Sequence, residues 1–355
     1  MSPAKPKAAP APTVPTAAKP LPRPSGPEIA AWILAGVGLL LILKLHLLAA
    51  LLGGLAVYEL VHLIASKLRF LRSGRGTRKI LAATLLAAVV VTVLILSVFG
   101  VVAFFRGGQG NLPALLGKMA DVLDTSKDQL PPWLADQLPD NAEEIKNLSV
   151  AWLRTHAGDV KTFGADLGRT FLHVLVGMIL GALVSLNETR GTPDRAPLAQ
   201  ALTERADRLG DAFRRIVFAQ ARISALNTAL TALYLLVVLP LLGVHLPFTK
   251  TLLGITFVAG LLPVVGNLIS NTVIVIVSLS YSLGAALGSM IFLLVIHKLE
   301  YFVNAKIIGT EIKASAWELL LAMLVMESAF GLSGVIAAPI YYAFLKTELT
   351  DRGLI

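Results

Sequence analysis

Residues 261–271 read LLPVVGNLISN, and this stretch decides the fold because it interrupts a long apolar run. Lipid offers no hydrogen bonds, so a helix broken at membrane depth must satisfy its freed backbone groups with protein or with water in a cavity. Broken hydrophobic segments are typical of transport sites in membrane proteins. The stretch therefore predicts a transporter in which this break lines the path of the solute.

The composition indicates a polytopic membrane protein. The 355 residues are 55% hydrophobic and 15% charged, whereas soluble domains average roughly 45–50% apolar and about 25% charged residues. The absence of cysteine excludes disulfides, thiolate metal sites and cysteine nucleophiles. A net charge of +9 is compatible with nucleic-acid binding. Because the basic residues flank apolar runs, they indicate cytoplasmic loops instead, and no nucleic-acid partner is expected.

The N-terminal half divides into three predicted segments. Residues 1–27 are mainly Ala, Pro and Lys and predict a disordered cytoplasmic tail. Residues 28–105 predict three transmembrane helices, the first two forming a hairpin over 29–43 and 46–66. The loop 67–79, with six basic residues and no acid, is the strongest positive-inside signal in the chain. Residues 106–170 have amphipathic helical patterns and predict a small extracytoplasmic helical domain.

Residues 171–347 predict the transport core, and 348–355 a short cytoplasmic tail. A fourth span is expected over 171–186, containing the small-residue pair Gly177 and Gly181. The arginine-rich segment 188–222 reads as a solvated cytoplasmic helix. Further spans are expected at 223–242, 250–270, 271–296 and 317–345; alternatively, 250–282 forms a re-entrant hairpin. The predicted fold is an all-α polytopic membrane protein of seven or eight transmembrane helices with broken or re-entrant segments.

Four short motifs give the chain a family resemblance. They are LGVHLP at 242–247, LLPVVGN at 261–267, LEYFVNAKIIG at 299–309 and FGLSGVIAAP at 330–339. In this order, and over residues 29–347, the chain resembles the autoinducer-2 exporter family, although Asn267 and Ala305 stand where relatives often carry proline. The resemblance implies export of small molecules, including the quorum-sensing furanone, and some relatives look like sodium–proton antiporters.

Polar residues after the break form the first candidate site. A helix beginning near residue 265 places Asn267, Ser270, Asn271 and Ser278 along one stripe, beside the break residues Pro263 and Gly266. Polar stripes on apolar helices face protein or water rather than lipid. The stripe predicts either a path whose amides bind a cation or a hydroxylated solute, or hydrogen bonding that only holds the helices together.

Glu327 is the second candidate, because it lies inside the last long apolar run. An ionisable group at membrane depth is costly and is a functional hypothesis by default. Gly331 and Gly334 follow at i+4 and i+7, so Glu327 is expected on a small-residue face packed against other helices. We interpret it as the carboxyl that couples transport to a proton or cation, or else as a structural group.

Two further sets complete the candidate residues. His297, Glu300, Asn304 and Lys306 close an apolar run and predict a gate or an interfacial anchor. Hinge or packing positions are expected at Gly309, Gly331, Gly334 and Pro339, with a kink at the glycines and a second break at the proline.

Enzyme motifs are largely absent from the sequence. There is no HExxH zinc helix and no phosphate- or dinucleotide-binding glycine loop, so no enzyme, metal or cofactor is expected. The GLSG run at 331–334 matches the nucleophile motif of intramembrane serine proteases. That chemistry needs a histidine in a following helix, and all six histidines precede Ser333.

The sequence therefore predicts a secondary transporter of the bacterial cytoplasmic (inner) membrane with both termini inside. Its partners are the lipid bilayer, a small solute and a proton or sodium ion; a homo-oligomer is compatible with the sequence. Two alternatives stay open. One is a sodium (or lithium)–proton antiporter, and the other is a non-transporting scaffold whose partner surface is the 106–170 segment.

Overall fold

The structure, a computed structural model, describes residues 24–68, 74–106, 121–122, 125, 142–187, 196–262, 265–312 and 314–355. Within these residues the chain is helical and contains no strand, which confirms the predicted all-α membrane class. The tail predicted over residues 1–27 lies almost wholly outside the described residues, and so does most of 107–141.

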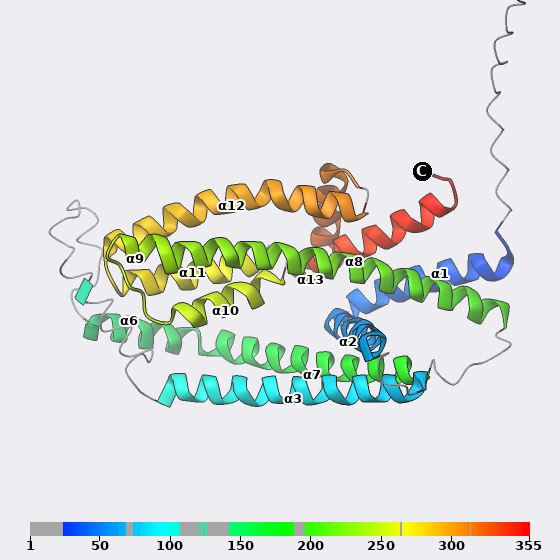
Figure 1. Cartoon of the computed structure of the whole chain (residues 1–355), viewed down its shortest axis with the longest axis horizontal. Coiled ribbons are helices and arrows are strands. Elements are labelled where there is room, and N and C mark those ends of the chain that lie inside the picture. The colour runs from blue at the N-terminus through cyan, green and yellow to red at the C-terminus, as the bar shows by residue number, and fades with distance from the viewer. Residues whose placement is uncertain are drawn as a thin grey trace, which may run out of the picture.

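The helices follow one another through short connections (Figure 1). The first group is α1 (Gly26–Lys44), α2 (Leu48–Lys67), α3 (Arg75–Arg106), α6 (Ala142–Thr155) and α7 (Ala157–Asn187). The second is α8 (Pro197–Leu233), the π-helical turn η4 (Tyr234–Val238), α9 (Leu239–Leu241), α10 (Thr249–Gly260), α11 (Val265–Leu279), α12 (Leu283–Ile312) and α13 (Ala316–Asp351). Among the described residues, six helices are long and apolar enough to cross a membrane.

Two predicted boundaries are wrong because helices continue across them. α7 runs unbroken from Ala157 to Asn187, so residues 157–170 belong to the same helix as the predicted span 171–186. Likewise, the predicted cytoplasmic segment 188–222 and span 223–242 share one helical rod from Pro197 to Leu241. Hydropathy shows where a helix enters an apolar environment, but not whether its backbone ends there.

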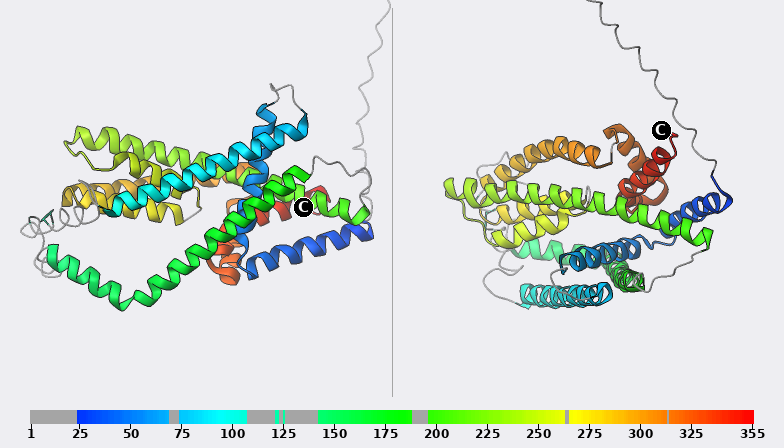
Figure 2. Two further views of the ribbon diagram at one scale, coloured as in Figure 1. Left: turned by 90° about the horizontal axis from the view of Figure 1, so that it is seen from below. Right: turned by 45° about the vertical axis from the view of Figure 1, so that its right-hand side comes forward.

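α8 is the central helix of the molecule. Figures 1 and 2 show it running the length of the molecule, with α10, α11 and α12 beside one part of it and α1, α2 and α13 near the other. Its C-terminal continuation η4 precedes Pro240, which has no backbone N–H. A proline in a helix removes one hydrogen bond and clashes with the preceding turn, which accounts for the π-helical turn here.

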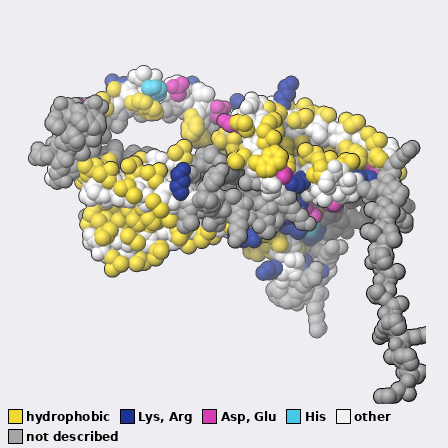
Figure 3. Space-filling view, turned by 90° about the horizontal axis from the view of Figure 1, so that it is seen from above, with side chains coloured by type: hydrophobic (Ala, Val, Ile, Leu, Met, Phe, Trp, Pro, Cys, Tyr) yellow, Lys and Arg dark blue, Asp and Glu magenta, His cyan; other side chains and the backbone are white. Residues whose placement is uncertain are grey.

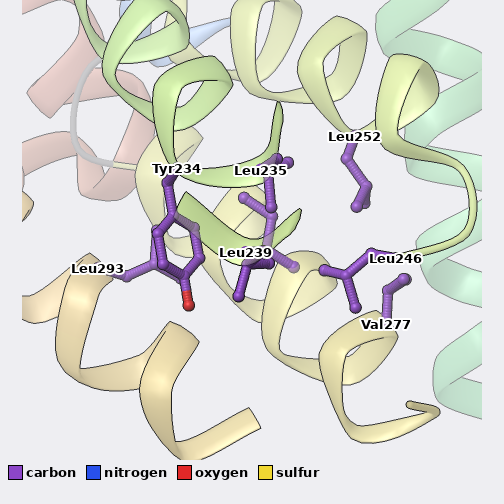
Figure 4. Packing of buried hydrophobic residues seen from close by; sticks show 8 residues of the cluster. Tyr234, Leu235, Leu239, Leu246, Leu252, Val277 and Leu293 are labelled. Atoms are coloured by element: carbon purple, nitrogen blue, oxygen red, sulfur yellow. The ribbon is translucent and has the colours of Figure 1, made fainter. Parts of the chain in front are cut away.

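Tyr234, Leu235 and Leu239, in the turns η4 and α9, anchor a buried core. They pack with Leu246, Leu252, Ile274, Val277 and Leu293 from α10, α11, α12 and the loop before α10 (Figure 4). Elsewhere large hydrophobic side chains are widely exposed, as the yellow surface in Figure 3 shows. An apolar exterior around a modest core is expected of helices whose outer faces meet lipid tails.

Charged contacts gather the two termini at one end of the molecule, at the right in Figure 1. Arg352 lies 2.5 Å from Glu28, and Trp32 donates a 3.0 Å hydrogen bond to Glu348. From α8, Arg208 lies 3.0 Å from the same Glu348 carboxylate. α1, α8 and α13 are therefore joined at the end where the sequence places its cytoplasmic segments.

α13 folds back on itself at Gly331. This residue has φ +59° and ψ −144°, a conformation that only glycine adopts readily. Glu318 at the start of α13 accepts hydrogen bonds from Tyr342 and from Lys346, the latter at 2.6 Å, so the two halves lie side by side. The predicted kink is thus a reversal, whereas the predicted second break at Pro339 is wrong, because the backbone stays helical there.

α2 and α7 pack closely through glycines. A Cβ atom at Gly177 would lie 2.0 Å from the carbonyl oxygen of Ala50, and one at Gly181 would lie 2.1 Å from that of Gly54. Small residues let helix backbones approach this closely in membranes. The Gly177–Gly181 pair is therefore a helix-packing motif.

We expect Gly181→Ala to destabilise the protein. Its methyl group overlaps the α2 backbone, and overpacking typically costs about 1–3 kcal/mol. Gly168→Ala is the matched control, because it lies in the same helix with open space around its Cβ position. Thermal unfolding of the detergent-solubilised protein measures both variants; equal melting temperatures would show that the glycine contact contributes nothing.

Candidate functional site

The break between α10 and α11 is a tight reversal rather than a kink in one long helix. α10 has 12 residues and α11 has 15, which makes them about 18 and 22 Å long. Neither reaches the roughly 30 Å thickness of a bilayer core. Leu252 of α10 packs against Ile274 and Val277 of α11, so the two helices run antiparallel. The structure replaces the predicted spans 250–270 and 271–296 with the alternative helical hairpin.

α8 satisfies the backbone where α10 ends. The last four carbonyl groups of a helix have no partner within it. Here Leu261 N–H donates to the Val258 carbonyl at 3.3 Å and Leu262 N–H donates to the Ala259 carbonyl at 2.8 Å. The other two, Phe257 and Gly260, accept hydrogen bonds from Ser224 at 2.6 Å and Gln220 at 2.7 Å. All four carbonyl groups are thus accounted for.

Gly260 and Gly266 make this close approach sterically feasible. A Cβ atom at Gly260 would lie 2.6 Å from the Ser224 hydroxyl, and one at Gly266 would lie 1.9 Å from the Ala259 carbonyl oxygen. Both positions therefore need glycine, because any larger residue would separate α10 from α8 or from α11. Pro263 falls outside the described residues.

The predicted polar stripe of α11 faces other helices. Asn267 accepts a 3.0 Å hydrogen bond from Asn227 of α8, and Ser270 is buried. Ser278 lies 2.8 Å from Ser289 of α12. Asn271 is partly exposed on the same helix. The structure brings the stripe together at the hairpin, where its hydrogen bonds are interhelical.

The sequence analysis missed the polar face of α8. Gln220, Ser224, Asn227 and Tyr234 recur at helical spacing, and the Tyr234 hydroxyl lies 3.1 Å from that of Ser289. The signal was the i, i+4, i+7 and i+14 pattern, which continues from an arginine-rich segment into an apolar one. Because that segment was interpreted as a solvated helix, its apolar-side polar residues were not considered.

Glu327 does not lie at the hairpin. Its side chain is exposed on the first half of α13, and within the described residues it has no hydrogen-bonding partner. The expectation of a shared face with Gly334 is wrong, because Gly331 reverses the chain between them. Gly334 is instead buried where the two halves meet, with its Cβ position 1.9 Å from the Met326 carbonyl oxygen.

The predicted gate residues lie in one continuous helix. His297, Glu300, Asn304, Lys306 and Gly309 all belong to α12, whose backbone is helical to Ile312. The interruption that the sequence suggested there is therefore absent. The side chains of these five positions are outside the described part of the structure.

A cavity of about 620 Å³ lies away from the hairpin, between α2, α7 and α8. Its walls are mostly apolar, with Tyr58, Asn187, Thr203 and Asp207 among the polar lining residues. Within the described residues no cluster of His, Asp or Glu has the arrangement of a metal site.

Comparison with known proteins identifies the family. Residues 29–351 match the sequence description of the AI-2E family transporter. No curated protein and no solved structure matches the chain. The match covers every described helix except the first turn of α1.

We expect Gln220→Leu to destabilise the hairpin. The Gly260 carbonyl would lose its donor, and a buried unsatisfied polar group costs about 1–3 kcal/mol. Gln200→Leu makes the same change at an exposed position of α8 and should leave stability unchanged. The free energy of unfolding in detergent measures both, and an equal effect of the two substitutions would exclude the proposed support of α10 by α8.

Proposed function

Because the chain belongs to the AI-2E family of transporters, we propose that it is a secondary transporter that exports a small solute, coupled to a proton or sodium gradient. The solute is an autoinducer-2-like molecule or a related metabolite. The membrane is the bacterial cytoplasmic membrane, with both termini inside. The observation that carries the proposal is the short α10–α11 hairpin, whose broken backbone is supported by polar side chains of α8.

The transport path follows the hairpin along α8. Irregular backbone at membrane depth is tolerated where it is buried in protein or lines an aqueous cavity. The α11 residues Asn267, Ser270, Asn271 and Ser278 provide the amide and hydroxyl groups, and Asn227 of α8 contributes another amide. Exchanging the Asn227–Asn267 hydrogen bond for one to a hydroxylated solute would open the path without leaving either amide unsatisfied.

Glu327 is proposed as the coupling carboxyl. Its helix is apolar on all sides and largely exposed in the single chain. Carboxyl groups on such helices are rare and mark proton or ion pathways. Protonation removes the charge and so lowers the cost of moving this segment through an apolar environment.

The gate is proposed at the C-terminal half of α12. His297, Glu300 and Asn304 share one helix face by their spacing of i, i+3 and i+7, and Lys306 follows in the next turn. α12 packs against α8 and α11, so a tilt of α12 would reach both the hairpin and this charged segment. Gly309, near its end, is the proposed hinge.

We expect Glu327→Gln to abolish gradient-coupled transport while the protein still folds. Amide replacement keeps the shape of the side chain but removes the exchangeable proton. The measurement uses proteoliposomes with a pH-sensitive dye inside, a sodium or lithium gradient, and labelled solute outside or inside. Asp166→Asn, an exposed acid on α7, is the control for loss of one negative charge.

The outcomes separate the alternatives. Solute flux that depends on the gradient and disappears in Glu327→Gln supports the proposal. Proton movement driven by sodium or lithium without any solute identifies a cation–proton antiporter. Normal coupled flux in Glu327→Gln removes Glu327 from the mechanism, and no flux of either kind in the native protein favours the scaffold alternative.

A further inference from the structure

We propose that the cavity between α2, α7 and α8 binds an amphipathic organic cation, with a single apolar chain and an ammonium head group. This site lies apart from the α10–α11 hairpin, and it does not depend on the proposed function. Its volume of about 620 Å³ falls within the roughly 300–1,000 Å³ that is typical of sites for drug-sized ligands.

The cavity has an apolar end and a polar end. Contacts of Ala50 with Gly177 and of Gly54 with Gly181 show that α2 and α7 run in the same direction. α8 runs against them, because Gly210 lies beside Glu59. The lining residues Asn187, at the end of α7, and Thr203, near the start of α8, therefore fall at the same end of the cavity as Tyr58.

The apolar end is suited to a hydrocarbon chain. Leucines, glycines and an alanine of α2 and α7 line it, and the glycines that allow the two helices to touch leave no side chains to fill the space. Leu180 and Val184 line the cavity and are also exposed on the outer surface of α7. The chain of a ligand can therefore enter from the apolar surroundings of α7.

Carboxylates outnumber basic groups at the polar end. Asp207 lines the cavity, and Glu59 lies against its wall, with one carboxylate oxygen 3.2 Å from the Cβ position of Gly210. Arg214 lies 2.8 Å from Asp211 and only 4.0 Å from Glu59, so one guanidinium serves two acids. The absence of a side chain at Gly210 gives the Glu59 carboxylate its place beside the cavity.

The other nearby cations are engaged elsewhere. Arg208 contacts Glu204, Glu348 and Asp351, which draw it towards α13. Lys79 lies 2.9 Å from the His62 ring and donates to the Ser185 carbonyl at 3.1 Å. An ammonium group at the polar end therefore meets a surplus of negative charge.

Tyr58 favours an ammonium group over other cations. Its ring lines the cavity, and ammonium groups bind to the faces of aromatic rings through cation–π attraction. An aromatic ring beside carboxylates at the end of an apolar cavity is suited to a head group that is charged but weakly hydrated. Asn187 and Thr203 can accept hydrogen bonds from a head group that carries N–H donors.

The test uses the absence of native cysteine, so that Thr203→Cys carries the only thiol. Protein in nanodiscs is labelled with maleimide in the presence of dodecyltrimethylammonium below its micellar concentration. We expect the cation to slow labelling of Thr203→Cys. Adding Asp207→Asn or Glu59→Gln should raise the half-protecting concentration about tenfold, and Tyr58→Leu should do the same, whereas Tyr58→Phe should not.

Controls make each outcome decisive. Asp166→Asn, far along α7, should leave protection unchanged, and size-exclusion profiles exclude unfolding as the cause of any loss. Direct binding of radiolabelled dodecyltrimethylammonium to the protein without Thr203→Cys provides an independent measurement. Equal protection by dodecanoate or by dodecyl maltoside would contradict recognition of positive charge. Protection by nanodisc phospholipid alone, or no protection by any amphiphile, would also overturn the proposal.

Discussion

A helix that ends in apolar surroundings leaves carbonyl groups that must find hydrogen bonds in the protein, and this requirement shapes the C-terminal half of the chain. Gln220 and Ser224 of α8 supply the two donors that the turn after α10 cannot provide for itself. Each buried, unsatisfied carbonyl would cost about 1–3 kcal/mol. The hairpin is therefore tied to α8, and Gly260 and Gly266 are required because the three segments touch.

α8 consequently has two roles along its length. Its middle turns hold the hairpin, and its first turns join the charged contacts that gather α1 and α13. A movement of α8 would therefore be felt both at the hairpin and where the termini meet. α13, which reverses at Gly331, repeats the device of a folded-back helix without requiring a proline at the turn. Two such hairpins beside one long helix are consistent with a transporter built from broken segments.

The sequence predicted those features that depend on local chemistry. The apolar runs, the basic loop at 67–79 and the proline–glycine break at 261–271 identified the helices and the interruption, and four ordered motifs identified the family. Features that depend on tertiary contacts were not predictable. The continuity of α8 and the role of Gln220 were hidden, because an arginine-rich sequence looks the same whether its apolar side faces water or a hairpin.

Glu327 shows the same limit for the candidate site. Periodicity placed it on one face with Gly334, but periodicity holds only while the helix continues, and the left-handed φ of Gly331 ends it. The stripe Asn267–Ser278 was correctly placed on one side of α11, because no break falls inside that helix. Its hydrogen bonds to Asn227 and Ser289 required knowledge of the neighbouring helices.

The central claim is that α10 and α11 form a hairpin whose two ends lie on the same side of the membrane. The hydroxyl of Tyr281, just after α11, donates a 2.8 Å hydrogen bond to the Gly243 carbonyl, which precedes α10. Single cysteines at Lys250→Cys and Ser282→Cys, labelled with a membrane-impermeant maleimide in vesicles of defined orientation, measure the sidedness directly. The account predicts that both react from the same face. Reaction of Ser282→Cys from the opposite face, or its complete protection within the bilayer, would contradict it.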